Sequence, residues 1–138
     1  MSANLNPIFS NTFILGMTRL VTGNTASNGS GSITKVVTGA TNGTRVDKIT
    51  YINSQLSAGA SSAMTGKIFL SSDGGSTWKL DNEIAIATAT RSTTAIGAKN
   101  IIITGGLFLP SGVILGVAQS VYAGVQDQQD VIVEGANY

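Results

Sequence analysis

Apolar and polar residues alternate over short runs of this chain, and no window keeps the i, i+3, i+4, i+7 apolar spacing of an amphipathic helix. The runs are rich in β-branched residues and are separated by clusters of glycine, asparagine and serine, which favour turns. This pattern predicts an all-β fold, an antiparallel β-sandwich of jelly-roll type with about eight strands. An immunoglobulin-like sandwich is the main alternative. The strands are predicted at residues 13–21, 32–38, 44–53, 66–71, 77–86, 99–104, 113–121 and 130–135.

Three of the predicted strands carry distinct patterns of apolar residues. In residues 44–53 the alternation slips near Asp47 and Lys48, which predicts a β-bulge. In residues 99–104 three consecutive isoleucines predict a strand that is buried on both faces. The first strand has one apolar face, made by Phe13, Leu15, Met17 and Val21.

The segment between the fourth and fifth strands predicts a tight hairpin. Gly74 and Gly75 can adopt the positive φ angles of a tight turn, and Asp73 can accept hydrogen bonds from turn amides. The pattern S-x-D-x-G-x-T-W resembles the Asp-box of sialidases and related β-propellers, where the box is a structural turn repeated once per blade. The chain contains one copy, so the resemblance supports a hairpin and gives little support to a glycosidase. The matching residues are Ser71, Asp73, Gly75, Thr77 and Trp78.

The fifth strand has the clearest alternation in the chain. Its polar face includes Asp81 and Glu83, a carboxylate pair that a glycosidase could use, but the solvated face of an amphipathic strand is the simpler interpretation. Trp78 and Tyr51 could form a sugar-stacking platform, and burial in the core is again the simpler interpretation. The residues expected to point inward together are Trp78, Leu80, Ile84 and Ile86.

Composition excludes several kinds of site. The 138 residues include no cysteine and no histidine, so thiol chemistry, histidine acid–base chemistry and the commonest metal ligands are absent. No catalytic residue, cofactor site or metal site can therefore be nominated, and we expect a protein that is not an enzyme. Asp127 and Asp130 are too few for a calcium site, and we expect them in a solvated loop.

Charge and hydropathy indicate which partners to expect. Only 11% of the residues are charged, so we expect part of the surface to be covered by partners or by copies of the chain. The eight basic residues are scattered and the net charge is +1, which argues against nucleic-acid binding. No apolar run reaches the ~20 residues of a membrane span, and no secretion signal is recognised, so synthesis in the cytoplasm is expected.

Four segments together resemble small tailed-bacteriophage virion proteins. They are GTRVDKI at 43–49, GKIFL at 66–70, LPSG at 109–112 and DVIVEGANY at 130–138. The resemblance implies a non-enzymatic structural subunit on the virion, in particular a capsid decoration or cement protein that stabilises the head shell. It also implies two partners, the major capsid protein and copies of the chain itself, with a homotrimer favoured over a dimer.

The chain divides into an N-terminal arm, residues 1–12, and a single sandwich domain, residues 13–138. Pro7 prevents the arm from alternating as a strand, and its apolar residues would gain from burial. We therefore consider a docking role for Leu5, Pro7, Ile8 and Phe9 beside the simpler possibility of a disordered or locally packed tail. A glycan-binding virion module, or one associated with the tail or a fibre, is the alternative function.

Overall fold

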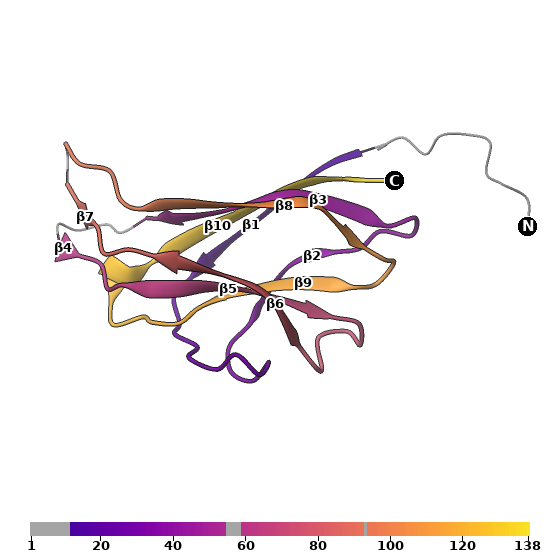
Figure 1. The fold of residues 1–138 in the computed structure, drawn as a ribbon, viewed down its shortest axis with the longest axis horizontal. Helices are drawn as coiled ribbons and strands as arrows, with labels where there is room; N and C mark the ends of the chain where they lie inside the picture. Colours follow the sequence, from indigo (N-terminus) through magenta and orange to yellow (C-terminus); the bar gives the residue numbers. More distant parts are fainter. Residues whose placement is uncertain (1–11, 55–58, 93) are drawn as a thin grey trace, which may run out of the picture.

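The computed structural model describes residues 12–54, 59–92 and 94–138, which form two four-stranded antiparallel sheets packed face to face (Figure 1). The first sheet has the order β1 (Thr12–Leu20), β10 (Gln129–Asn137), β3 (Thr44–Asn53) and β8 (Lys99–Leu109). The second sheet has the order β2 (Thr34–Thr38), β9 (Ile114–Gln119), β5 (Met64–Ser71) and β6 (Lys79–Ile86). A small pair, β4 (Gly59–Ala60) with β7 (Thr90–Arg91), and a 3-10 turn, η1 (Val125–Asp127), complete the elements of the described residues.

The predicted antiparallel β-sandwich is confirmed. Consecutive strands mostly alternate between the two sheets, as in the jelly-roll type of sandwich. In an immunoglobulin-like sandwich the first two strands lie in the same sheet, whereas β1 and β2 lie in different sheets here. β3 has the predicted bounds. β8 continues to Leu109 and does not end at residue 104 as predicted. Residues 104–106 fall at a register shift inside this strand.

The predicted bulge in β3 is confirmed. Asp47 is skipped in the pairing with both neighbours, since Val46 pairs with Gly135 and Leu107, and Lys48 pairs with Glu134 and Ile103. The extra residue brings both Val46 and Ile49 to the inner face of the first sheet, where both are fully buried. The slip in the apolar alternation is therefore the sequence signature of this bulge.

Tyr51 connects the two sheets through the centre of the core. It projects from β3, is fully buried, and its hydroxyl donates a hydrogen bond to the carbonyl oxygen of Lys67 in β5 at 2.9 Å. Gly66 in β5 leaves the space for the ring, because a Cβ there would lie 2.9 Å from two ring carbons. Tyr51 belongs to a core cluster with residues from both sheets, including Ile49, Ile68 and Val117.

The chain itself covers the outer face of the second sheet. Lys67 points to this face and is buried, and its ammonium donates hydrogen bonds to the carbonyl oxygens of Thr25 and Ala26 and to the Ser27 hydroxyl at 2.8–3.1 Å. These three residues belong to the β1–β2 loop, which therefore lies over the sheet. Phe69, on the same face of β5, is fully buried as well.

The prediction that Trp78, Leu80, Ile84 and Ile86 point inward together is wrong for the first two. The register between β5 and β6 shifts so that Asn82 pairs with Ile68 and Leu80 pairs with Phe69. Ile84 and Ile86 face the core, whereas Leu80 lies on the outer face of the second sheet. Trp78 also lies on that outer face, against Gly116, where a Cβ would stand 2.7 Å from the indole ring.

Replacing Tyr51 by Phe tests its role as the connection between the sheets. The change removes one buried hydrogen bond and keeps the ring, so we expect the free energy of unfolding to fall by about 1 to 1.5 kcal/mol. Urea unfolding near neutral pH measures this change. Tyr122→Phe is the matched control, with an expected change below about 0.5 kcal/mol. Equal effects of the two substitutions would contradict the assignment.

The same residue predicts a pH dependence. Burial raises the pKa of the Tyr51 hydroxyl above its ordinary value of 10.0. The folded state therefore holds this proton more tightly than the unfolded state, and stability present below about pH 10 is lost as the pH rises further. Urea unfolding at several pH values above 10 should show a steeper loss for the wild type than for Tyr51→Phe. Parallel pH curves for the two proteins would refute this prediction.

Candidate interaction surface

The outer face of the first sheet carries the largest group of exposed apolar side chains on the described residues. Strand pairing aligns its outward residues in rows; one row runs from Met17 through Ile132 and Thr50 to Ile101. The exposed fractions of the main contributors are 73% for Phe13, 53% for Leu15, 67% for Met17, 45% for Ile101 and 52% for Phe108. With the half-buried Ile52 and Ile132, these residues form what we call the outer apolar face.

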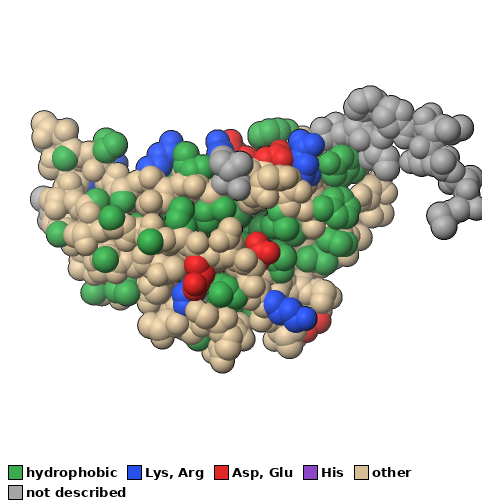
Figure 2. Space-filling view, in the orientation of Figure 1, with side chains coloured by type: hydrophobic (Ala, Val, Ile, Leu, Met, Phe, Trp, Pro, Cys, Tyr) green, Lys and Arg blue, Asp and Glu red, His purple; other side chains and the backbone are tan. Residues whose placement is uncertain are grey.

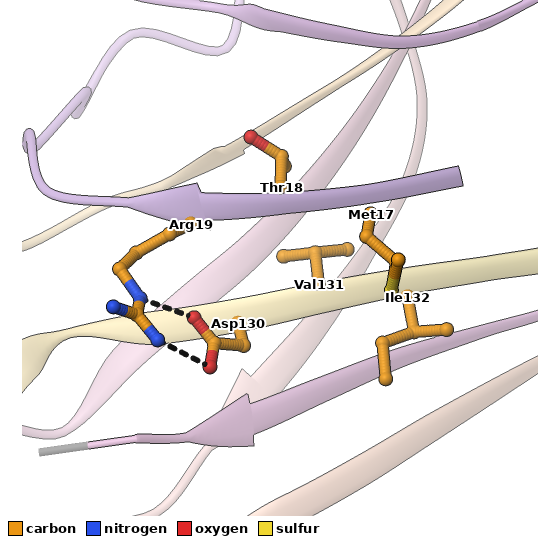
Figure 3. A pocket seen from close by; sticks show the side chains of 6 residues that line it. All are labelled: Met17, Thr18, Arg19, Asp130, Val131 and Ile132. Carbon is orange, nitrogen blue, oxygen red and sulfur yellow. Dashed lines mark hydrogen bonds and ion pairs between the residues drawn. The ribbon is translucent and has the colours of Figure 1, made fainter. Parts of the chain in front are cut away.

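Most charges on this face pair with one another. Arg19 in β1 holds Asp130 in β10 through two hydrogen bonds of 2.7 and 3.1 Å (Figure 3). Lys48 approaches Glu134 to 2.5 Å, and Arg45 approaches Asp47 to 2.8 Å. The hydrogen bonds from Arg19 lower the pKa of the Asp130 carboxyl, and the same contact raises the pKa of the Arg19 guanidinium. Each of these three cations therefore has an anion beside it. Lys99, which pairs with Ile52 at the start of β8, adds one exposed charge without a carboxylate partner among the described residues, so the face is nearly neutral.

A shallow hollow marks one end of the face. Met17 and Ile132 lie beside the Arg19–Asp130 pair, and all four side chains lie on the same side of the two strands (Figure 3). In Figure 2 the face forms the upper edge of the molecule, where hydrophobic side chains lie between basic and acidic ones. The hollow is open, and its polar groups are already hydrogen-bonded to each other, so it offers no convergent set of groups for a small molecule.

The expected burial of residues 101–103 on both faces is wrong for the single chain. Ile102 is buried in the core, but Ile101 points outward and remains exposed, because no described segment covers the outer apolar face. The apolar side of β1 that the sequence predicted lies on this same face through Phe13, Leu15 and Met17. Val21 follows the end of β1 and is also exposed.

The Asp-box hairpin is built by its own polar side chains. The Asp73 carboxylate accepts hydrogen bonds from the Thr77 amide and hydroxyl, the Ser76 amide and the Ser71 hydroxyl, at 2.6–3.0 Å. These bonds, with those from Thr77 the strongest, hold the pKa of Asp73 well below its ordinary range. Gly74 and Gly75 adopt φ angles of 76° and 89°, which few other residues adopt. The predicted hairpin between β5 and β6 is confirmed as a structural turn.

The carboxylates considered as candidate chemistry have structural contacts. Glu83 accepts a hydrogen bond from the Ser27 hydroxyl at 3.2 Å, and Asp81 is the extra residue at the register shift of β6. Asp127 is fully buried, not solvated as expected, because its oxygens accept hydrogen bonds from the Ser62 and Ala123 amides at 2.6 and 2.7 Å. Within residues 12–54, 59–92 and 94–138, no three acidic residues gather as a metal site would require.

The proposed sugar-stacking pair is not assembled. Tyr51 is enclosed in the core, whereas Trp78 lies on the outer side of the second sheet. The two rings are therefore separated by that sheet. No helix in the described part of the chain is long and apolar enough to cross a membrane.

Three of the segments that resemble virion proteins meet at one end of the sandwich. The Thr44 hydroxyl donates a hydrogen bond to the side-chain oxygen of Asn137 at 2.6 Å, and the Tyr138 amide donates to the carbonyl oxygen of Gly43 at 3.2 Å. The turn after β8 joins the same end through the Gly112 amide, which donates to the Gly39 carbonyl oxygen at 3.0 Å. These segments thus secure turns and the C-terminus, and the ring of Phe108 beside Tyr138 continues them into the outer apolar face.

The predicted docking residues Leu5, Pro7, Ile8 and Phe9 lie outside the described residues. The sequence pattern indicates the apolar side of β1 but not the complete face, because that face combines residues from four strands that are distant in the sequence. The consecutive isoleucines in β8 were the signal in the sequence that could have indicated the complete face. Their pattern indicates burial on both faces, which one copy of the chain does not provide.

Comparison of the chain with protein-family models, with curated proteins and with solved structures finds no match. Function is therefore inferred from the geometry and chemistry of the chain. Two observations are central: the outer face of the second sheet is covered by the chain's own β1–β2 loop, and the outer face of the first sheet is apolar and exposed.

Replacing Asp73 by Asn tests the structural role of the hairpin. Asparagine has one acceptor oxygen in place of two and carries no charge, so we expect a lower melting temperature by circular dichroism. The lowered pKa means that the carboxylate stabilises the fold above about pH 4 and loses this effect as the pH falls further. The difference between the two proteins should therefore shrink in acid. Asp81→Asn is the control, and an equal effect at that position would contradict the assignment.

Proposed function

We propose that this protein is a non-catalytic structural subunit of a bacteriophage virion, a capsid decoration protein that binds the major capsid protein and copies of itself. The observation that carries the proposal is the outer apolar face, which is exposed in the single chain and nearly neutral in charge. Covering such a face with another protein surface lowers the free energy, because apolar area is removed from water. In a virion shell, a neighbouring subunit can cover this face at every position of the regular lattice.

The remaining features support a structural role over a catalytic one. The polar clusters of the described chain serve internal purposes: Asp73 closes a hairpin, Asp127 ties two turns together, and Lys67 holds the β1–β2 loop. The segments that resemble virion proteins contribute to turns and strand ends. The resemblance therefore falls on the framework of the sandwich, as expected for a family whose members share a structural role.

The low charge of the chain, 11% of its residues, makes a specific prediction about attachment to the shell. Burial of apolar surface is weakly affected by salt, whereas contacts between exposed charges weaken within a Debye length that shortens as salt rises. Virions of the phage that encodes the chain should therefore retain it after washing in about 1 M salt, as measured by quantitative mass spectrometry of the washed particles. Release of most copies in moderate salt would contradict the proposed mode of attachment.

A cryo-EM map of the same particles tests the location. The proposal expects this β-sandwich at regular positions on the outside of the head shell, in contact with the major capsid protein. Density confined to the tail or its fibres would contradict the decoration role and would favour the alternative of a tail-associated module.

A further inference from the structure

We infer that the outer apolar face is a self-association surface, on which a second copy of this chain packs through the same face about a two-fold axis. This inference deepens the proposed function, on which it rests for its biological setting, and it names the occupant of the exposed face. Three features of the described chain lead to it: the chemistry of the face, its size, and the distribution of apolar residues over the rest of the surface.

The chemistry of the face suits an identical partner. A partner of opposite charge would require unpaired charges on this face, but Arg19, Lys48 and Arg45 each contact a carboxylate of the same chain. What the face offers is apolar area between ion pairs, with Met17 and Ile132 next to Arg19 and Asp130 (Figure 3). A copy of the same face offers apolar area and paired ions in return, and the described cation of this face without a carboxylate beside it, Lys99, lies at a corner of the sheet, where its ammonium can reach solvent.

The size of the face fits a small stable interface. Four strands about 4.8 Å apart and about nine residues long at about 3.3 Å per residue give a face of roughly 19 by 30 Å. This corresponds to about 600 Å² per partner, without the additional area of side chains that project from the sheet. Specific interfaces begin at about 1,200 Å² in total, so two such faces together reach the required range.

The rest of the described surface favours two-fold symmetry. A ring of three copies needs two different complementary surfaces on each copy, whereas a two-fold dimer needs one self-complementary surface. The exposed large apolar residues away from this face lie in different elements. Val21 follows β1, Leu80 lies in β6, Ile96 lies between β7 and β8, and Val125 lies in η1. They provide no second apolar face to receive the first one.

Packing by faces also explains the exposed residues better than pairing by edges. β1 is an edge strand, so it could pair with β1 of another copy. Edge pairing, however, would extend the sheet and leave Phe13, Leu15 and Met17 exposed on its outer side. Only packing on the outer side covers them, and it also covers Ile101 in β8, at the opposite edge of the sheet.

Sedimentation velocity of the full chain over a range of concentrations tests the inference. We expect a monomer–dimer equilibrium for the wild type. Leu15→Lys and Met17→Lys should each weaken dimerisation by about 100-fold or more, because each places an ammonium in the centre of an apolar interface. Both positions are exposed in the monomer, and residue 15 lies across from Glu134, so both variants should keep the wild-type melting temperature measured at a concentration that gives monomers. Val125→Lys is the control, a lysine at an exposed apolar position in η1, and should leave the dissociation constant unchanged.

Four outcomes would overturn the inference. They are a wild type that stays monomeric at high concentration, a trimer, a dimer that survives both face substitutions, and a dimer lost in the arm variant Ile8→Lys/Phe9→Lys, which would assign the contact to the N-terminal segment. These outcomes are independent of the proposed function, which is tested on virions. A monomer found on the head shell would refute the dimer and leave the decoration role standing, and a dimer absent from virions would do the reverse.

Discussion

The buried ring and hydroxyl of Tyr51 connect the two sheets of this protein at the centre of the core. The hydrogen bond from the hydroxyl to the Lys67 carbonyl oxygen requires β3 to direct Tyr51 inward and β5 to present Gly66 beneath the ring. Side chains alternate along a strand, so the inward direction of Tyr51 sends Thr50 and Ile52 outward. Pairing with β10 and β1 then carries this choice to Ile132 and Met17, and the exposed apolar face follows from a buried contact.

The two outer faces of the sandwich differ in how they are covered. On the second sheet, the buried ammonium of Lys67 binds three oxygens of the β1–β2 loop, and Trp78 packs on Gly116. The first sheet has no such covering among the described residues, yet its outward positions include phenylalanine, leucine, methionine and isoleucine. A chain with 11% charged residues has few means of keeping such a face soluble, so covering by another copy is the simplest way to stabilise it.

Local patterns in the sequence predicted much of this structure. The slip at Asp47 indicated a bulge, and the segment from Ser71 to Trp78 indicated a hairpin, because both depend on residues close together in the chain. The direction of Trp78 and Leu80 was wrong, because a single register shift between β5 and β6 reverses the face of every residue on one side of it. The interaction surface could not be predicted as a whole, since it forms only when β1, β10, β3 and β8 are placed side by side. The burial of Asp127 likewise depends on Ser62, which is distant in the sequence.

The oxidation rate of Met17 as a function of protein concentration shows whether a second copy covers the outer apolar face. Met17 lies in the middle of β1 on the outer apolar face and is exposed in the single chain, whereas Met64 is buried in the core and reports on unfolding. Peroxide converts an accessible methionine to its sulfoxide, and mass spectrometry gives the initial rate at each site. If copies pack through this face, the Met17 rate falls as the concentration rises through the range of dimer formation, while the Met64 rate stays low throughout. A Met17 rate that is the same at all concentrations would contradict this packing.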